Sequence, residues 1–524
     1  MKRLTHFAGA LLAAAFFILY AATAQRGVAW QDSGVLQLRV VYRDLLGVGG
    51  LACAHPLYVA ATHFLAGLAS RARGIEAPSA ANLASAFWMA LALGLFHGCA
   101  RRLSGSARAA LLATLTLGLA HLPWWLATVA ESYTMSLALI AAETACVIRI
   151  IQGEGSFRLY VGAALAAGAG FAVHNLSLLS LPVSAATLAA IAICDIRRTC
   201  RANGLPHAGP ASRFVDICIW SILNLHFLFL AGALLAVWLF GARTVIEPAR
   251  LAHAAGTPLH AVLYNVLFGA YGPEVVGRSR LPLSFAFVNL GIVALSLSSP
   301  CWAVGAAAFF RRIRAAGGLR AAWRAVAPAT RYVMALFTVH ALFAVRYRVA
   351  DQALFFLPTL FFGALLLATL LSSCRAPHLF AAATIAAAIA VPIAANAVLH
   401  APPVARRVLA ARARLLPFRD ELRYWALPWK SNEDSAERFA AEAIRRMDAR
   451  GGLLYADSTA APPVMLRMGG HGDNWTLFTP WNDNTVFSSA ARAGTAVFAV
   501  SPVKGYCPDD ALATGNVKPL FAAE

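Results

Sequence analysis

Residues 30–46 read WQDSGVLQLRVVYRDLL, and residues 54–58 read AHPLY. This stretch directly follows the first apolar segment, so Asp32 is expected just outside a membrane-spanning helix, where the chain emerges into water. A carboxylate at the membrane surface, followed by an amphipathic run and a His-Pro pair, is an unusual start for a structural protein. The rest of the sequence decides on which side of a membrane this stretch lies.

The chain has the composition of a polytopic helical membrane protein. Of its 524 residues, 60% are hydrophobic and 13% are charged, with a mean hydropathy of +0.64, which is too apolar for a soluble domain of this length. The apolar runs are Ala- and Leu-rich and too continuous for barrel strands, which alternate. We predict about eleven spanning helices, the first one retained as an anchor, at residues 5–24, 79–99, 109–127, 132–151, 157–173, 175–194, 217–240, 282–310, 329–345, 353–373 and 377–399.

The formal net charge of +20 does not indicate a nucleic-acid partner. The arginines lie in short connections between apolar segments, where they set the orientation of the chain and contact anionic lipids. The nine cysteines are scattered and lack the spacing of a metal site, so we predict neither a disulfide framework nor a bound metal. No phosphate-binding or dinucleotide motif is present, and we predict no cofactor.

The segment 57–70 is ambiguous, because it is apolar but short. If it does not span the membrane, most basic residues of the short loops fall on the inner side, whereas a spanning segment would move most of them outside. The positive-inside rule therefore predicts a juxtamembrane helix on the outer face. Ionisable residues at membrane depth are costly and usually functional. In this topology a set of polar residues converges on the outer face: Asp32, His55, Glu131, His174, Asn175, Arg346, Arg348 and Asp351.

The composition changes after the last predicted span. Residues 435–449 are amphipathic and predict a helix, and residues 453–456 and 496–500 predict short strands. The Gly-, Asn- and Trp-rich residues 469–484 are predicted as loop. We therefore predict a transmembrane domain over residues 1–400, with its first outer loop over 25–78, and a small soluble α/β domain over 401–524 on the outer side.

Each candidate residue also has a structural interpretation. Asp32 could be a general base or a helix cap, and Glu131 could position a substrate or cap the helix that follows it. His55 could bind a phosphate or an acceptor, although a role at the helix end is favoured. For His174 and Asn175 a tight outer turn is favoured.

Arg346 and Arg348 lie at the outer headgroup level, before Asp351. Two arginines at this level are suited to holding a lipid-linked phosphate. The competing interpretation is contact with lipid headgroups without any chemistry.

Five short motifs, in order, resemble those of the GT-C superfamily of integral-membrane glycosyltransferases. More closely, the chain is similar to the domain-of-unknown-function family 2723, which includes transmembrane protein O-mannosyltransferases. The resemblance covers residues 1 to about 375, since the motifs are DSG (32–34), HPLY (55–58), ESYT (131–134), VHNL (173–176) and VADQALFFLP (349–358).

The resemblance implies transfer of a sugar from a polyprenyl-phosphate donor on the outer side of the membrane. It implies that Asp32 is the catalytic base, that Glu131 shapes the site, and that the region of Arg346 and Arg348 meets the donor phosphate. The chain departs from the family pattern at Val35, where the family usually has an acid, and its His-Pro motif is shortened. Metal assistance is therefore not expected.

We predict an all-α polytopic, GT-C-like inverting glycosyltransferase of a bacterial inner membrane, with its active site and C-terminal domain in the periplasm. Its predicted partners are a polyprenyl-phosphate sugar, the lipid bilayer, and an acceptor that is a protein, a lipid or a glycan. One alternative is a transporter or flippase of lipid-linked saccharides, which should show inverted repeats and midplane charges. The other is a non-enzymatic membrane scaffold whose tail binds a partner.

Overall fold

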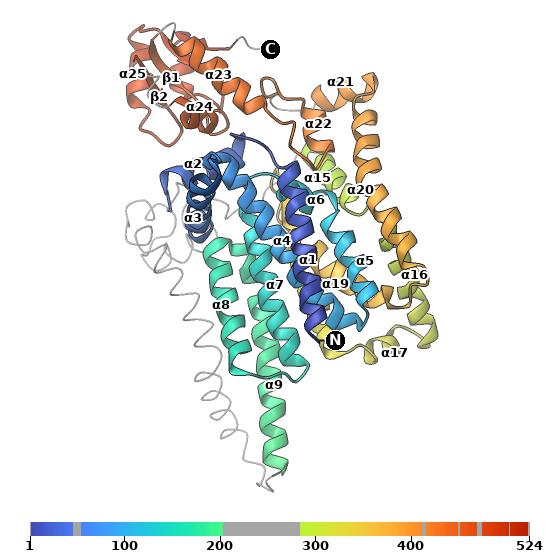
Figure 1. Cartoon of the computed structure of the whole chain (residues 1–524). Helices are drawn as coiled ribbons and strands as arrows, with labels where there is room; N and C mark the ends of the chain where they lie inside the picture. Colours follow the sequence, from blue (N-terminus) through green and yellow to red (C-terminus); the bar gives the residue numbers. More distant parts are fainter. Residues whose placement is uncertain are drawn as a thin grey trace.

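The computed structural model of the chain describes residues 2–45, 54–202, 283–410, 415–448, 451–468, 474–501 and 504–521. A bundle of helices forms the larger part of the molecule (Figure 1). Its elements are α1 (Lys2–Thr23), α2 (Gln31–Tyr42), α3 (Pro56–Arg73), α4 (Ala77–Ser104), α5 (Ala107–Gly118), α6 (His121–Leu126), α7 (Ser132–Ile151), α8 (Phe157–Val173), η2 (Asn175–Leu179), α9 (Leu181–Ala202), α15 (Leu283–Ser296), α16 (Pro300–Ala315), α17 (Leu319–Arg324), α18 (Pro328–Arg346), η5 (Gln352–Phe356), α19 (Leu357–Leu370), η6 (Leu371–Ser373) and α20 (Pro377–Leu399).

Among the described residues, six helices are long and apolar enough to cross a membrane. They cover Ala77–Ser104, Ser132–Ile151, Asn175–Cys194, Pro328–Arg346, Gln352–Ser373 and Pro377–Leu399. Shorter apolar helices lie at Phe7–Thr23, Ala107–Gly118 and Phe157–Val173. The predicted span at 217–240 lies outside the described residues, so the count of eleven stays a prediction.

Two predicted spans are interrupted. The span at 282–310 is a pair of helices, α15 and α16, bent by 79°, because Ser299 caps a new helix that Pro300 begins. The span at 109–127 breaks after Gly118, where α5 ends before α6 begins. A Cβ on Gly118 would lie 2.4 Å from the ring of Phe16, so the glycine lets α1 approach closely. At residues 299–300 a local capping feature therefore starts a new helix within a continuous apolar run.

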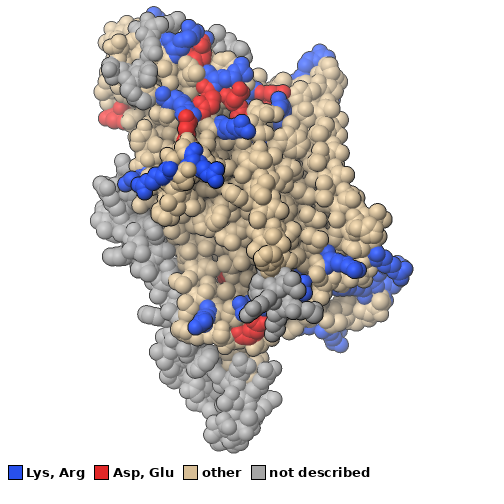
Figure 2. All heavy atoms as spheres, viewed as in Figure 1, with Lys and Arg blue, Asp and Glu red and all other residues tan. Residues whose placement is uncertain are grey.

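The ambiguous segment 57–70 lies within α3, which is not among the helices apolar enough to cross a membrane. Its residues Tyr58 and Val59 form a hydrophobic cluster with Leu36 of α2 and Ala81 of α4. Figure 1 places α2 and α3 near the end of the bundle that faces the sheet, while the N-terminal end of α1 lies at the opposite end. In the face shown in Figure 2, charged side chains gather at these two ends and leave an apolar band between them, as a bilayer requires.

The C-terminal region contains a small parallel sheet with helices beside it. Its described elements are α21 (Pro402–Ala410), α22 (Glu421–Ala426), α23 (Ser435–Asp448), β1 (Gly452–Tyr455), α24 (Ala461–Met468), β2 (Trp475–Phe478), α25 (Thr485–Arg492), β3 (Val497–Ala499), α26 (Asp509–Leu512) and β4 (Val517–Pro519). The strand order is β2-β1-β3-β4, with all pairs parallel. Strand β2 lies within residues 469–484, which were predicted as loop, and that prediction was wrong. Trp475 and Phe478 are buried at the two ends of this four-residue strand, which is too short for its pattern to stand out among glycines and asparagines.

Hydrophobic contacts cross the predicted boundary at residue 400. Val28 and Trp30, which follow α1, lie in one buried cluster with Phe439 of α23. Trp425 and Trp429 pack against the core of the helix bundle. The division into domains over 1–400 and 401–524 therefore stays a prediction, and the two parts share their packing where they meet.

Candidate functional site

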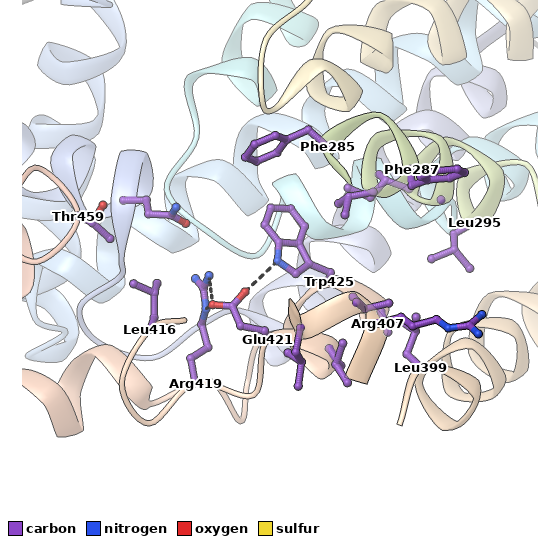
Figure 3. A pocket seen from close by; sticks show the side chains of 18 of the residues that line it. Phe285, Phe287, Leu295, Leu399, Arg407, Leu416, Arg419, Glu421, Trp425 and Thr459 are labelled. Atoms are coloured by element: carbon purple, nitrogen blue, oxygen red, sulfur yellow. Dashed lines mark hydrogen bonds and ion pairs between the residues drawn. The ribbon is translucent and has the colours of Figure 1, made fainter. Parts of the chain in front are cut away.

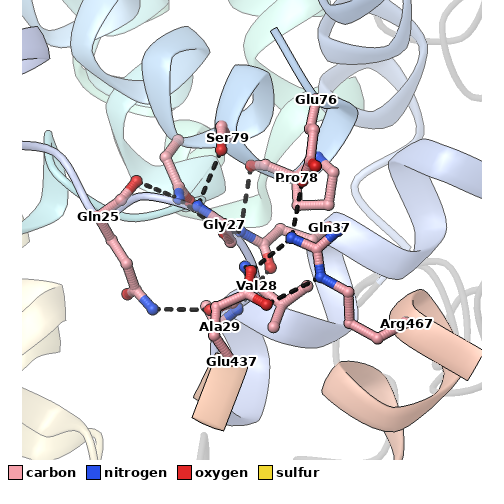
Figure 4. Close-up of polar contacts among 11 residues, drawn as sticks. Gln25, Gly27, Val28, Ala29, Gln37, Glu76, Pro78, Ser79, Glu437 and Arg467 are labelled. Carbon is pink, nitrogen blue, oxygen red and sulfur yellow. Dashed lines mark hydrogen bonds and ion pairs between the residues drawn. The ribbon is translucent and has the colours of Figure 1, made fainter. Parts of the chain in front are cut away.

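The loop between α1 and α2 is held by buried side-chain amides (Figure 4). Gln37 of α2 accepts a hydrogen bond from the Ala29 N–H at 2.7 Å and donates one to the Gly27 carbonyl at 3.0 Å. It also donates to Oδ1 of Asn82 in α4 at 3.1 Å, while Asn82 donates to the Gln25 carbonyl at 2.8 Å. Because Gln37 and Asn82 are fully buried, these bonds fix the loop in one position.

An ion-pair cluster fastens the same loop to the C-terminal region, as Figure 4 shows. Glu437 of α23 accepts a hydrogen bond from the Val28 N–H at 2.8 Å. Arg467 of α24 donates to Glu437 Oε2 at 2.9 Å and to Glu76, just before α4, at 2.7 Å. Gly27 leaves room for this contact, since a Cβ there would lie 1.9 Å from Oε1 of Glu437. The loop is therefore clamped between α4 and α23.

Two backbone features direct the first turn of α2. Gln31 has a φ of 55°, in the left-handed region, so the chain turns sharply just before Asp32. The Gly34 N–H donates to the Trp30 carbonyl at 3.2 Å. A Cβ on Gly34 would lie 2.2 Å from the Ala29 carbonyl oxygen. The glycine of the Asp-Ser-Gly motif therefore permits the close backbone approach that positions Asp32.

Three carboxyl groups from distant parts of the sequence meet at the start of α2. Ser33 donates a hydrogen bond to Glu131 Oε1 at 2.9 Å, which ties α2 to the start of α7. The negative charges of Asp32 and Asp351 both act on Glu131. Glu131 is buried and Asp351 is half-buried. Asp32 remains open to solvent, although protein surrounds it on most sides. Three of the five sequence motifs thus contribute an acid to one place.

Burial raises the pKa of all three carboxyl groups. The pKa of Asp32 rises through burial. That of Glu131 rises to about 8, first through burial and then through the charge of Asp32. That of Asp351 rises to about 7, through burial and again through Asp32. Like charges at close range are not all ionised together, so Asp32, the member most open to water, is the group best able to carry the charge.

The structure distinguishes the interpretations that the sequence left open for the two acids. The cap position of α2 is Trp30, and no side chain caps that helix, so Asp32 is not a helix cap. Glu131 does occupy the cap position of α7 but makes no capping hydrogen bond. Its carboxylate accepts the Ser33 hydroxyl instead. Both side chains are therefore available to the site and are not used in helix capping.

Two stacked imidazoles border the acidic group. The rings of His55 and His174 lie 4.9 Å apart, and the ring of His174 lies 4.8 Å from that of Tyr133. Burial lowers the pKa of His55 to about 4, with the positive charge of a neighbouring arginine adding to the effect, and burial also lowers the pKa of His174 well below its usual range. Both imidazoles are therefore neutral at pH 7.

Backbone partners fix the tautomers of these histidines. Nδ1 of His55 lies 2.8 Å from the Val173 carbonyl oxygen, so it carries the proton and leaves Nε2 as an acceptor. Nδ1 of His174 accepts the Leu176 N–H at 3.0 Å, so its Nε2 carries the proton. His174 lies at a turn, as predicted, and the Nε2–H of its ring is also available as a hydrogen-bond donor.

The remaining candidates lie around the segment that follows α18. Tyr347 packs on Phe355 with ring centroids 4.5 Å apart, which anchors this segment. Arg346 and Arg348, on either side of Tyr347, have exposed side chains. Asn175 begins η2 and is half-buried. The structure thus gathers Asp32, Glu131, Asp351, His55 and His174, while the two arginines stand at the surface beside them.

Within the described residues, no group of three or more His, Cys, Asp or Glu side chains is arranged to hold a metal ion. No protein-family model matches the sequence, and no curated protein matches it. Among solved structures, the chain is similar to ArnT from Cupriavidus metallidurans bound to undecaprenyl phosphate, with a TM-score of 0.51 and 14% identity over 94% of this chain and 89% of ArnT.

The apo state of the same ArnT gives a TM-score of 0.50 and 14% identity over 93% of this chain and 91% of that one. ArnT is a GT-C glycosyltransferase. The chain has a GT-C fold. An oligosaccharyltransferase from Archaeoglobus fulgidus is also similar, with a TM-score of 0.47 and 10% identity over 98% of this chain and 67% of that one. The closer resemblance to the domain-of-unknown-function family 2723 stays a prediction.

Several residues that position this site within the GT-C fold were missed from the sequence. Gln37 and Asn82 are buried amides within otherwise apolar helical runs. A buried amide needs hydrogen-bond partners, so their position on an apolar face was the available signal in the sequence. Lys430 is buried at 4.4 Å from the ring of Tyr424, and burial lowers its pKa to about 7. Its backbone N–H donates to the Thr23 carbonyl at 2.8 Å, at the end of α1. No local pattern could have paired residues so far apart in sequence.

The raised pKa of Glu131 predicts a stability that depends on pH. Its folded value of about 8 lies above the ordinary 4.5, so the protonated form stabilises the fold below pH 4.5, and this contribution is lost as the pH rises through about 8. Glu131→Gln stays neutral at every pH and can still accept the Ser33 hydrogen bond. We expect the thermal midpoint of the wild type in detergent to fall by several degrees across this range, and that of the variant to fall less. Parallel curves would contradict the assignment.

Proposed function

We propose that the chain is a glycosyltransferase that moves a sugar from a polyprenyl-phosphate-linked donor to an acceptor hydroxyl, with Asp32 as general base. The observation that carries the proposal is the carboxyl group of Asp32, open to solvent beside the buried Glu131 and the half-buried Asp351, at one end of a GT-C fold. The capture of undecaprenyl phosphate by ArnT supports a donor of this class. We further propose that this end faces the periplasm of a bacterial inner membrane.

The proposed reaction is a single in-line displacement. Asp32 accepts the proton of the acceptor hydroxyl, and the hydroxyl oxygen forms a bond to the anomeric carbon. The bond between that carbon and the phosphate oxygen breaks, and the polyprenyl phosphate leaves with the electron pair. Because attack and departure occur on opposite faces of the sugar, the anomeric configuration inverts. The polyprenyl tail remains in the lipid throughout, while its phosphate stays at the interface.

The neighbours of Asp32 have separate roles in this proposal. Glu131, held by Ser33, keeps the first turn of α2 in place and is protonated near neutral pH. The Nε2 atoms of His55 and His174, one acceptor and one donor, are suited to sugar hydroxyls. Neutral imidazoles are poor phosphate ligands, so the donor phosphate is assigned to the exposed arginines beside Asp351.

Removal of one of these arginines is expected to weaken donor binding selectively. Arg346→Gln and Arg348→Gln should each raise KM for the polyprenyl-phosphate sugar about tenfold, the cost of one hydrogen bond to a charged group, with a smaller effect on kcat. Arg331→Gln, which removes an exposed arginine near the start of the same helix, is the matched control. The measurement is transfer of radiolabelled sugar by the purified protein in lipid nanodiscs. Unchanged KM in both variants would exclude the phosphate assignment.

A further inference from the structure

The turn that carries Asp351 is held by a buried amide of helix α15. Nδ2 of Asn289 donates a hydrogen bond to the Ala350 carbonyl at 3.0 Å, and Oδ1 accepts one from the Ala353 N–H at 2.8 Å. One side chain therefore bonds the residue before Asp351 and the second residue after it. Nδ2 also donates to the Phe285 carbonyl, one turn earlier in α15, at 2.9 Å. Both N–H groups and the oxygen of this amide are thus bonded, and Asn289 is only 5% exposed.

The two bonds to the turn require an amide at position 289. The Ala353 N–H is a donor, so its partner must accept, whereas the Ala350 carbonyl is an acceptor, so its partner must donate. A carboxylate of the same shape could accept the Ala353 N–H but would face the Ala350 carbonyl oxygen without a hydrogen. Leucine, which has nearly the same size, could make neither bond. Asparagine is therefore specified by the chemistry of the turn and not by its volume.

Asn289 is the single amide of an otherwise apolar helix. The sequence of α15, LSFAFVNLGIVALS, contains no charged residue. Figure 3 shows Phe285, Phe287 and Leu295 of this helix at the border of a pocket of about 440 Å³, and Asn289 is not among the described residues that line it. A strongly polar side chain in a membrane helix is costly and usually functional. Here it serves the turn of Asp351 and not the pocket.

Helix α15 is itself fixed to the bundle. Ser296 Oγ accepts the Leu122 N–H of α6 at 3.0 Å and donates to the Ile292 carbonyl at 2.8 Å. Ile292 belongs to the main hydrophobic core, and the helix packs against both α6 and η5. Because α15 is held in this way, the bonds of Asn289 give the turn of Asp351 a defined place.

A second amide holds the same turn from the side of α18. Nε2 of Gln352 donates to the carbonyls of Ala344 and Val345 at 2.8 and 3.1 Å. These carbonyls belong to the last turn of α18, directly before Arg346. The two amides therefore have separate targets. Gln352 ties the turn to the helix end that carries Arg346, whereas Asn289 ties the residues on either side of Asp351 to α15.

An asparagine in a membrane helix often only joins two helices through their side chains. The partners of Asn289 in the turn are instead backbone groups, one on each side of a single acid of the candidate site. We propose that Asn289 is a positioning residue, which holds the turn against α15 and thereby keeps the carboxyl group of Asp351 beside Asp32. The charge of Asp32 acts on Asp351, so movement of the turn would change the surroundings of the proposed base. This inference rests on the proposed transferase function for the part of Asp351 in transfer, whereas the position of the turn can be measured without it.

The first test measures the position of the turn without any activity. Asp351→Cys introduces a thiol at a half-buried position, and its rate of labelling by a maleimide is measured in the full-length protein in detergent. The protein without this substitution gives the background from the native cysteines. Adding Asn289→Leu should raise the labelling rate about tenfold, because the turn loses two hydrogen bonds. Asn289→Asp should raise it as well. The matched control is Asn396→Leu in α20, where the amide oxygen has no hydrogen-bond partner among the described residues, and it should leave the rate unchanged.

The second test asks whether Asn289 acts through Asp351. Alone, Asn289→Leu should lower kcat for sugar transfer about tenfold, while KM for the donor stays within about twofold, because Gln352 still holds the end of α18. In Asp351→Ala the carboxyl group is absent, so adding Asn289→Leu should lower kcat by less than about twofold further. A general loss of folded protein would instead reduce kcat equally in both backgrounds, so this double-mutant cycle distinguishes positioning from damage.

Two results would overturn the inference. An unchanged labelling rate in Asn289→Leu would show that the amide does not hold the turn. An equal loss of kcat with and without the carboxyl group of Asp351 would show that the effect of Asn289 does not pass through it. If the wild type transfers no sugar, the proposed function fails, and the labelling rates still decide whether Asn289 holds the turn of Asp351.

Discussion

Asp32→Asn is expected to reduce kcat/KM for sugar transfer about 10³-fold, the middle of the range for a positioned general base. Asparagine has nearly the same shape but cannot accept the proton of the attacking hydroxyl. The first turn of α2 should stay in place, because Ser33 and Gly34 make the contacts that hold it. The measurement is transfer from a polyprenyl-phosphate sugar in nanodiscs, at matched protein and lipid concentrations.

The control is Asp434→Asn, the same chemical change at an exposed carboxylate in the C-terminal region, which should leave transfer unchanged. The pH profile gives a second readout. Because burial raises the pKa of Asp32, the base is protonated and inactive at low pH, and wild-type activity should fall as the pH drops through a value above that of an ordinary aspartate. Full transfer activity in Asp32→Asn would exclude Asp32 as the general base, whereas absence of transfer by the wild type as well as the variant would favour a scaffold over an enzyme.

The sequence predicts the candidate site residues better than it predicts the contacts that hold them in place. Asp32, Glu131 and Asp351 could be grouped because each follows or precedes an apolar run, and the charge of the loops places all three at one face. Counting the predicted membrane crossings puts all three acids on one face of the membrane. Their meeting at one place on that face depends on packing contacts such as the hydrogen bond from Ser33 to Glu131.

The supporting contacts depend on pairs that no local pattern specifies. The indole N–H of Trp30 donates to Ser435 Oγ at 2.8 Å, and its ring lies 4.7 Å from that of Phe439. Glu437 and Arg467 likewise contact residues far away in the sequence, Val28 and Glu76, which no local pattern specifies. A tryptophan beside an apolar helix is equally consistent with lipid contact, and only the fold brings α23 over it.

Gly34→Ala is expected to lower kcat/KM for transfer about 10²-fold, through displacement of Asp32 by about 1 Å. The added Cβ would lie 2.2 Å from the Ala29 carbonyl oxygen and 3.1 Å from Pro462 Cβ. The amide network around Gln37 holds Ala29 from one side and α24 blocks the other, so the strain falls on the first turn of α2. Overpacking of this kind costs about 1–3 kcal/mol of stability, which is less than the net stability of a typical folded domain, about 5–15 kcal/mol.

The matched control is Gly67→Ala in the neighbouring helix α3, where an added Cβ meets no atom within 4 Å. It should transfer sugar like the wild type and have a similar or higher thermal midpoint, since alanine favours a helix. Donor binding separates displacement of Asp32 from general damage. If Arg346 and Arg348 hold the donor independently of α2, Gly34→Ala should lower kcat while KM for the donor stays within about twofold of the wild type. A rise in KM equal to the fall in kcat/KM, with kcat unchanged, would mean that the glycine serves donor binding and does not position the base.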